Sequence, residues 1–547
     1  MYIKKIKLHN FKRFKGDYEL ELTSGLNILV GNNGIGKSTI IEAIHLALSG
    51  YFQGKYLKNG ISQYLFNHDV IFDYLRKVNS GEHIDLPEMY IEIWFDECPT
   101  MNGTNHTGTE PADGLTYKVC FNEEYKSEYE NLISSGKITT LPIEYYHIVW
   151  ESFRQEHITS RSIPFKPAYI DSSKIIQNTS DLYISHIIRN KLSEDDKVKI
   201  SQAYREAQQV FLESEHLANV NQQLSLASYD SETIKLSVDL SANAWEGYIS
   251  AYLNEIPFHY AGQGMQSIMK TKLAIEKRSA DNLGIILLEE PENHLSFSRL
   301  NSLLSNIKSS QNDKQIIVST HSSFVLNKLG LKSLLLLSEN GKIRLDNLSE
   351  DTYKYFEKLA GYDTLRLILS RKTILVEGDS DELVIQKAYM VQNEGRLPID
   401  DGIDVMCIRG LSFLRYLEIA KSLRIPVAVV TDNDGAPCRV AEKFSDFTDC
   451  DNIQVFFDEV IDNAETLSCN REVIPDGFNF NTLEPKILKE NSICTLNIIF
   501  NKDLTTNEQV LMYMHRNKSK CALDIFSTNT SISFPEYITK AVEWAAR

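Results

Sequence analysis

The 547-residue sequence lacks several features that would assign it to a specialised class. Its eight cysteines form no Cys-x-x-Cys pair, which argues against a zinc knuckle and against a disulfide framework. The longest apolar runs, such as residues 285–288 and 334–337, are strand-sized and far too short to span a membrane. The start, MYIKKIKLHNF, lacks the apolar core of a signal peptide. We therefore expect a globular, cytoplasmic protein with no membrane partner.

The sequence also lacks the excess of basic residues that nucleic-acid-binding proteins usually carry. Its net charge is −17, whereas phosphate neutralisation favours a basic surface. Binding to DNA would therefore need a locally basic surface, or cations bound over a carboxylate site. The local candidates are Lys4, Lys5, Lys7, Lys12, Arg13 and Lys15, together with Arg516, Lys518 and Lys520. For the N-terminal group, an ordinary solvated face is an equally good interpretation.

The length and the spacing of apolar segments predict an α/β chain of several domains. We expect one α/β domain in two parts, residues 1–175 and 231–345, and a second α/β domain at 346–547, with the boundary near 338–371. Between the two parts, the pattern is polar and helical from about residue 181 to 226, and residues 193–224 contain neither glycine nor proline. The inserted segment 176–230 is thus either a helical arm used for dimerisation or a plain helical insertion.

A nucleotide site is predicted by Gly31-Asn-Asn-Gly-Ile-Gly-Lys-Ser, which follows an apolar strand at 26–30 and precedes a helix at 39–48. The glycines let backbone N–H groups face phosphates at a helix N-terminus. We expect Lys37 to reach the β- and γ-phosphates of ATP and Ser38 to bind Mg²⁺. The other residues of this loop that we assign to the nucleotide are Asn32, Asn33, Gly34, Gly36 and Thr39.

The segment Ile285-Ile-Leu-Leu-Glu-Glu-Pro-Glu supplies the acidic partner of this loop. Four apolar strand residues deliver Glu289 to the magnesium ion, and Glu290 follows in position to activate a water molecule. After the next strand, Thr320-His-Ser places His321 where it can sense the γ-phosphate.

These motifs together resemble the ABC-type ATPases of the SMC and RecF kind. The resemblance implies that ATP lies between two heads, and hence a homodimer or higher homo-oligomer. The counterpart of the signature motif is Ala261-Gly-Gln-Gly-Met-Gln, followed by a helix at 267–277. Gly262, Gly264 and Gln266 are present, but the usual serine is missing, which predicts slow hydrolysis.

The last domain carries two acidic motifs about 55 residues apart, Val376-Glu-Gly-Asp-Ser-Asp and Val429-Val-Thr-Asp-Asn-Asp-Gly. Strand ends of a parallel sheet converge on one edge, so Glu377, Asp381, Asp432 and Asp434 can meet around hard cations. Either motif alone is a weak signal, but in this order they resemble the Toprim fold.

Two further matches narrow the resemblance. Asn481-Thr-Leu-Glu supplies Glu484, and Lys518-Ser-Lys-Cys-Ala supplies Lys518 ahead of a short helix. An ABC head followed by such a Toprim unit is similar to the OLD family of nucleases (overcoming lysogenisation defect), which includes nucleases of Gabija and retron defence systems. Partners in that family include a UvrD-like helicase and a retron reverse transcriptase with its RNA–DNA product.

The resemblance implies two-metal hydrolysis of DNA with Mg²⁺ or Mn²⁺, in addition to the Mg²⁺ that accompanies ATP. Glu377, Asp432 and Asp434 are assigned to one ion, Asp381 and Glu484 to the other, and Lys518 to the transition-state charge. The main hypothesis is an ATP-regulated DNA endonuclease or nickase in antiviral defence. The alternative is a non-catalytic, ATP-dependent DNA clamp or sensor. A primase fits poorly, because the zinc-binding cysteines are missing. Whether ATP inhibits or licenses cleavage stays open.

Overall fold

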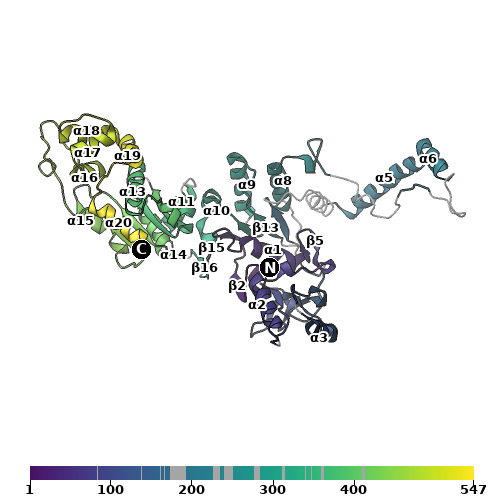
Figure 1. Ribbon diagram of the computed structural model, residues 1–547. Helices are drawn as coiled ribbons and strands as arrows, with labels where there is room; N and C mark the ends of the chain where they lie inside the picture. Colours follow the sequence, from purple (N-terminus) through teal and green to yellow (C-terminus); the bar gives the residue numbers. More distant parts are fainter. Residues whose placement is uncertain are drawn as a thin grey trace. The chain divides into compact units, whose positions relative to one another are not determined.

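The computed structural model divides the chain into two compact units, Met1–Thr320 and His321–Arg547 (Figure 1). The expected boundary region, 338–371, lies within the second unit. The structure describes these residues: 1–82, 84–136, 138–160, 162–164, 167–172, 192–225, 235–238, 251–275, 284–310, 314–338, 341–345, 348–358, 363–408 and 413–547. No helix in these ranges has the length and hydropathy needed to cross a membrane.

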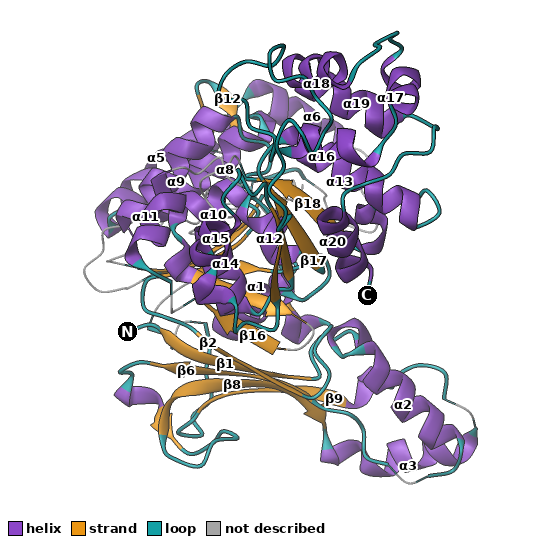
Figure 2. Cartoon of the chain, turned by 90° about the vertical axis from the view of Figure 1, so that its left-hand side faces the viewer, coloured by secondary structure: helices purple, strands orange, loops and turns teal. Residues whose placement is uncertain are grey.

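The first unit contains an antiparallel sheet in which the strands run in the order β2-β1-β6-β8-β7, with β9 paired to β8 (Figure 2). The apolar residues of β1 and all seven residues of β6 are buried, which fixes the register of their pairing. These strands are β1 (Ile3–His9), β2 (Asp17–Glu21), β6 (Met89–Phe95), β7 (Asn102–Gly103), β8 (Ala112–Phe121) and β9 (Tyr146–Ser152).

Four parallel strands of the first unit are paired in the order β10-β13-β14-β3. They are β3 (Leu26–Val30), β10 (Ala168–Asp171), β13 (Ile285–Glu289) and β14 (Gln315–Ser319). All residues of β3, β13 and β14 are buried, as expected for parallel strands covered on both faces. Because the strands are parallel, the phosphate loop after β3 and the acidic residues after β13 lie at the same edge.

Helix α1 (Lys37–Ser49) contacts both sheets of the first unit, namely β6 and β8 on one side and β13 and β14 on the other. Its interior residues are almost all buried, and the Trp150 indole N–H donates to the Ala47 carbonyl at 3.0 Å. The helix that follows the phosphate loop is therefore held from two directions.

Where residues of the predicted helical insertion are described, they form α5 (Glu194–Leu212) and α6 (Glu215–Ser225). Ser193 and Asp196 cap the start of α5 reciprocally. Residues 176–191 and 226–230 of that segment lie outside the described residues. The remaining elements of the unit are β4 (Tyr51–Phe52), β5 (Lys55–Tyr56), α2 (His68–Asn79), α3 (Lys126–Ser135), β11 (Tyr252–Leu253), β12 (Ile256–Pro257), α8 (Gln263–Ile275) and α9 (Phe297–Ser310).

The second unit is built on a parallel sheet in the order β18-β17-β19-β20. Its strands are β17 (Lys372–Val376), β18 (Ile403–Cys407), β19 (Val427–Val430) and β20 (Ile453–Phe456). Helices α13 and α20 pack on the sheet and on each other, and α19 packs on α13. The other elements are the hairpin β15 (Leu334–Ser338) and β16 (Gly341–Arg344), and the helices α10 (Ser323–Leu329), α11 (Glu350–Lys358), α12 (Thr364–Leu369), α13 (Asp379–Gln392), α14 (Phe413–Leu423), α15 (Pro437–Lys443), α16 (Leu483–Glu490), α17 (Ile493–Phe500), α18 (Asn507–Arg516), α19 (Lys518–Ser527) and α20 (Glu536–Ala546).

Candidate functional site

The phosphate loop connects β3 to α1, and the helix begins two residues earlier than expected, at Lys37. Gly36 has φ = 111°, and a Cβ atom there would lie 2.6 Å from the Phe14 ring, so the position requires glycine. The buried Lys37 ammonium donates to the carbonyls of Gly31 (2.8 Å) and Asn32 (3.1 Å). Asn32, Asn33, Gly34 and Ser38 are exposed, whereas Thr39 is buried.

Glu289 and Glu290 differ in their surroundings although they are adjacent. Glu289 ends β13 and is buried, and its carboxylate accepts a 2.9 Å hydrogen bond from the Tyr169 hydroxyl of the neighbouring strand β10. Glu290 has left-handed backbone geometry, φ = 46°, which turns the chain out of the strand. Burial lowers the pKa of Lys37, and the charge of Glu290 partly offsets that effect. Glu290 is therefore electrostatically coupled to the phosphate-binding lysine.

The signature counterpart corrects one expectation, because its helix α8 begins at Gln263 and not at residue 267. The Gly262 carbonyl accepts hydrogen bonds from the N–H groups of Met265 and Gln266, so Gly264 and Gln266 already belong to the first turn. A Cβ atom on Gly264 would lie 2.2 Å from the His294 carbonyl oxygen. Within this unit Gly264 therefore packs against the loop that follows Glu290.

His321 is the first residue of the second unit, directly after Thr320. It is followed by helix α10, whose N-terminus is capped by the Ser322 hydroxyl through the Val325 N–H at 3.3 Å. The expected γ-phosphate sensor is thus joined covalently to a helix of the unit that carries the acidic motifs.

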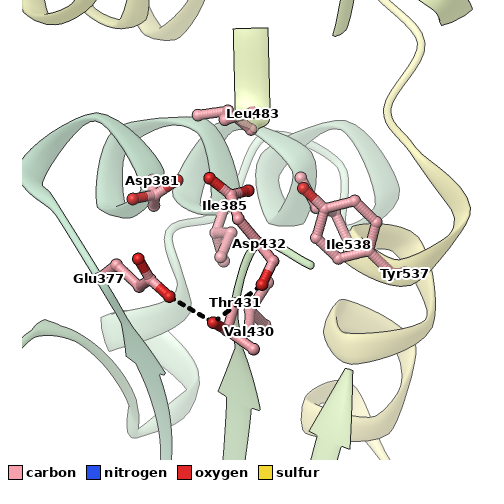
Figure 3. Close-up of a pocket in the computed structure, with 9 residues that line it drawn as sticks. All are labelled: Glu377, Asp381, Ile385, Val430, Thr431, Asp432, Leu483, Tyr537 and Ile538. Atoms are coloured by element: carbon pink, nitrogen blue, oxygen red, sulfur yellow. Dashed lines mark hydrogen bonds between the residues drawn. The ribbon is translucent and has the colours of Figure 1, made fainter. Parts of the chain in front are cut away.

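The acidic motifs of the second unit meet in a pocket at the carboxyl ends of β17 and β19 (Figure 3). Glu377 directly follows β17, Asp381 lies in the first turn of α13, and Asp432 follows β19 after Thr431. Figure 3 shows all three carboxylates directed into the same space. The rest of the lining is Ile385, Val430, Thr431, Leu483, Tyr537 and Ile538.

The pocket disfavours three negative charges without a cation. Burial raises the pKa of Asp381 to about 6, and the Glu377 charge adds to this rise. Burial, followed by the charges of Asp381 and Glu377, raises the pKa of Asp432 well above its usual range. These shifts are what burial and like-charge repulsion produce together. A divalent cation would remove the repulsion, so the donor set fits a hard metal ion.

Asp434, Glu484 and Lys518 do not line this pocket but have defined partners. Asp434 accepts a 2.7 Å hydrogen bond from the Asn479 amide. Glu484 is buried in the first turn of α16, and its two oxygens lie 3.1 and 3.2 Å from the Lys518 ammonium. Lys518 is the first residue of α19. Of the five predicted carboxylates, three therefore share the pocket, whereas Asp434 and Glu484 each pair with another side chain.

Two of the three pocket carboxylates, Glu377 and Asp381, also keep a local hydrogen bond. The Thr431 hydroxyl donates to Glu377, and the Gly378 N–H donates to Asp381 at 2.9 Å. In the described ranges no three His, Cys, Asp or Glu side chains form a ready-made metal cage. Binding of an ion by these carboxylates therefore requires their side chains to rearrange.

The basic groups proposed as DNA contacts fall into two classes. Near the N-terminus, Lys7 pairs with Asp17 at 2.8 Å, Lys12 pairs with Glu42, and Lys15 pairs with Asp73 at 2.9 Å. Near the C-terminus, Arg516 and Lys520 are exposed on the unit that carries the acidic pocket. The pairing of the N-terminal lysines favours their interpretation as an ordinary charged face.

Sequence reasoning missed three side chains of the two sites. Thr431 stands inside the second acidic motif, so its position beside Asp432 was a usable signal. Tyr169, which contacts Glu289, and Tyr537, which lines the acidic pocket, lie outside all motifs. Tyr537 is buried, and burial together with Asp432 and Asp381 raises its pKa well above its usual range, so its hydroxyl stays protonated. Only the fold brings these tyrosines to their sites.

Comparison with known families gives two matches. Residues 1–326 match the family described as AAA ATPase domain. Residues 368–434 match the Toprim domain of overcoming-lysogenization-defect-like proteins, and this segment contains Glu377, Asp381, Asp432 and Asp434. The chain is thus an ATPase unit followed by a Toprim unit of this type.

Several individual proteins are similar to the chain. Endonuclease GajA of Bacillus cereus (strain HuB5-5) is 20% identical, over 79% of this chain and 77% of that protein. The structural maintenance of chromosomes protein 3 homolog of Plasmodium falciparum (isolate 3D7) is 25% identical over 65% of this chain, but the match spans only 27% of its own length. A crystal structure of an Smc head bound to the C-terminal winged helix domain of ScpA has a TM-score of 0.35 and 16% identity, covering 63% of this chain and 98% of that chain.

Proposed function

The chain belongs to the AAA ATPase domain family, and from this premise we propose that it is an ATP-regulated, metal-dependent DNA endonuclease or nickase. The observation that carries the proposal is the pocket where Glu377, Asp381 and Asp432 converge, within a unit that matches a Toprim domain. The similarity to an endonuclease over most of the chain supports it. We include antiviral defence in the proposal, because the order of the two units resembles that of the OLD family.

The acidic pocket supplies the chemistry of phosphodiester hydrolysis. Glu377, Asp381 and Asp432 would hold divalent cations, with Asp434 and Glu484 completing a two-ion site. Bound there, Mg²⁺ or Mn²⁺ would supply Lewis-acid stabilisation of the attacking and leaving oxygens. Lys518 carries a positive charge beside Glu484, which suits it to offset charge on a scissile phosphate. Arg516 and Lys520 add positive charge to the same unit for the flanking DNA backbone.

Control by ATP is supported by contacts inside the second unit that lead from His321 to the acidic pocket. In α10, Ser323 accepts a 3.3 Å hydrogen bond from the Leu365 N–H, and Asn327 accepts a 2.8 Å bond from the Thr364 hydroxyl, both in α12. Helix α12 leads directly into β17, the strand that Glu377 directly follows. A shift of His321 on ATP binding could therefore reach the pocket through two packed helices.

A shared nucleotide site is part of the proposal. ABC-type heads bind ATP between two copies, which would place Gly262, Gly264 and Gln266 of one copy against the nucleotide of the other. We expect a dimer or larger homo-oligomer by light scattering at micromolar concentration. A strict monomer with and without ATP would contradict the shared site.

The nuclease assignment is tested by nicking of supercoiled plasmid in Mg²⁺ or Mn²⁺. Glu377→Ala should reduce the rate by on the order of 10²-fold or more, the usual cost of removing an electrostatic catalytic group, while ATP affinity stays within about a few-fold of wild type. The matched control is Asp379→Ala, which removes an exposed carboxylate two residues away and outside the pocket.

Two outcomes would count against the assignment. Cutting by Glu377→Ala at the wild-type rate would remove the acidic pocket from the reaction. A wild-type protein that binds DNA in an ATP-dependent manner but never cuts it would instead support the non-catalytic clamp.

A further inference from the structure

Beside the acidic pocket lies a buried ammonium group that the proposed reaction does not use. The side chain of Lys486, in α16, is only 3% exposed. Its Nζ atom donates to the carboxylates of Asp458 (2.5 Å) and Asp462 (2.6 Å) and to the Val460 carbonyl (2.9 Å). All three partners belong to one loop, residues 458–462. The buried cation thus holds this loop against α16.

The same loop is held from the other side by the second acidic motif. Asn433, which stands between Asp432 and Asp434, is buried and donates to the carbonyls of Asp458 (2.5 Å) and Val460 (3.0 Å). The Oδ1 atom of the same side chain accepts the Gly435 N–H at 3.0 Å, so both the nitrogen and the oxygen of the Asn433 side-chain amide have hydrogen-bond partners. Lys486 and Asn433 therefore bind Asp458 and Val460 from two different segments.

A third contact joins the loop to the segment that carries Glu484. The Asn481 side chain accepts the Asp462 N–H at 2.7 Å and donates to the Asp462 carbonyl at 3.0 Å. Asn481 precedes Glu484 by three residues and Lys486 follows it by two, so the loop contacts the chain on both sides of that carboxylate. Leu483, next to Glu484, lines the pocket beside Asp432 (Figure 3).

We propose that Lys486 is a positioning residue that sets the spacing between Glu484 and the Asp432–Asp434 motif by holding the loop 458–462 between them. This inference rests on the proposed function, and it assigns Lys486 no contact with DNA or metal. A two-ion site needs its carboxylates placed to within a fraction of an ångström. A buried ion pair is a poor source of stability compared with apolar packing, but it fixes one arrangement of the segments it joins.

The proposal is tested by titrating Mn²⁺ into the full-length protein and measuring free Mn²⁺ by electron paramagnetic resonance. Lys486→Met should weaken Mn²⁺ binding by about 10- to 100-fold, the usual effect of removing a group that orients metal ligands. In plasmid nicking, kcat should fall while KM for DNA stays within about a few-fold, because no DNA contact is removed. Circular dichroism establishes that the variant is folded.

A matched control separates positioning from stability. Asp404→Asn breaks another ion pair of the same unit, in which the half-exposed Arg366 donates to the buried Asp404 at 2.8 and 2.6 Å. This variant should lose stability but keep the wild-type Mn²⁺ affinity. If folded Lys486→Met binds Mn²⁺ as tightly as wild type, the positioning role is wrong.

A second variant covers the case in which Lys486→Met fails to fold. Asn433→Ala leaves Lys486 paired with both carboxylates but cuts the link from the loop to Asp432 and Asp434. It should show the same weakening of Mn²⁺ binding, and wild-type affinity in this variant would overturn the proposal. If the wild-type protein itself binds no Mn²⁺, the proposed function fails instead, so the two failures are distinguishable.

Discussion

The two units each bury a lysine next to a proposed site, but the lysines have opposite surroundings. In the nucleotide region, Lys37 has, among the described residues, the carbonyls of Gly31 and Asn32 as its hydrogen-bond acceptors. In the acidic region, Lys486 is in contact with the carboxylates of Asp458 and Asp462. Burial lowers the pKa of Lys37. In the acidic region, burial acts to raise the pKa of Asp462, but hydrogen bonds from Lys486 and from the neighbouring Lys489 outweigh it and hold that pKa below its usual range.

This difference suggests different roles for the two lysines: Lys37 is suited to binding an anionic ligand, and Lys486 to holding protein segments in place. A buried cation without a full counter-charge is costly in the free protein, and it becomes favourable when an anion such as a phosphate arrives. A buried cation with two carboxylates is already satisfied and has nothing left to bind. By the same argument, the acidic pocket resembles Lys37 with the sign reversed. Its carboxylates repel one another in the free protein, and their charge becomes favourable when a cation binds.

The largest expected effect is on the free energy of unfolding when each of the two lysines is replaced by methionine. Lys486→Met leaves Asp458 without its cation and Asp462 with Lys489 alone, so it should destabilise the protein by up to about 3–5 kcal/mol. Lys37→Met removes an uncompensated buried charge, so the nucleotide-free protein should be at least as stable as wild type while ATP binding is lost. Urea unfolding in the absence of nucleotide and metal measures both. Equal destabilisation by the two substitutions would abolish the distinction.

The second prediction applies the contrast to the acidic pocket. Because the folded-state pKa of Asp381 is raised to about 6, this group contributes stability that is complete below its unfolded pKa and is lost as pH rises through about 6. In EDTA at pH 7.5, Asp381→Asn should therefore stabilise the protein by about 1–3 kcal/mol. The gain should shrink as the pH falls through about 6, and thermal unfolding across pH 4–8 measures it.

Excess Mn²⁺ should reverse the sign of this effect, because the ion binds the ionised carboxylate and therefore stabilises wild type more than Asp381→Asn. A variant that is less stable than wild type in EDTA at every pH would show that Asp381 is an ordinary structural carboxylate.

The smallest expected effect concerns the link between the two regions. Thr364→Val removes the buried hydrogen bond to Asn327 that joins α12 to α10. It should reduce the effect of ATP on nicking by about 0.5–2 kcal/mol, or roughly 2- to 30-fold, without changing the rate at zero ATP. Thr373→Val is the matched control, since this buried hydroxyl has no hydrogen-bond partner in the part of the chain that the structure describes. Equal responses to ATP in both variants would remove this contact from the coupling.

The sequence predicted the parts of both sites that depend on local pattern. The phosphate loop, the strand before Glu289 and the two acidic strand ends are continuous segments whose residue types follow from their chemistry. The sequence predicts too late a start for α8, because Gly262 and Gly264 are residues typical of a loop, whereas the Gly262 carbonyl already accepts helical hydrogen bonds. Residues 181–191, part of the predicted helical segment, lie outside the described residues.

The parts that sequence could not predict depend on contacts between distant segments. Tyr169 reaches Glu289 only because β10 pairs with β13, and Tyr537 reaches the acidic pocket only because α20 packs on β19. Lys486 stands in a helix whose charge pattern is that of an ordinary surface, and its burial depends on the loop 458–462. A single sequence does not report which lysine is buried, so the positioning network is a result of the structure alone.

The proposed function requires that ATP bound in one unit controls a metal-dependent nuclease in the other. The most direct test is the rate of plasmid nicking in Mg²⁺ as a function of ATP concentration, for wild type, Lys37→Ala and Glu290→Gln. A ligand shifts an equilibrium only by its differential affinity for the two states, so the empty and the trapped nucleotide states should differ. We predict that ATP changes the wild-type rate, that Lys37→Ala cuts at the ATP-free rate throughout, and that Glu290→Gln holds the opposite, ATP-bound rate. Identical rates in all three proteins at every ATP concentration would contradict the account.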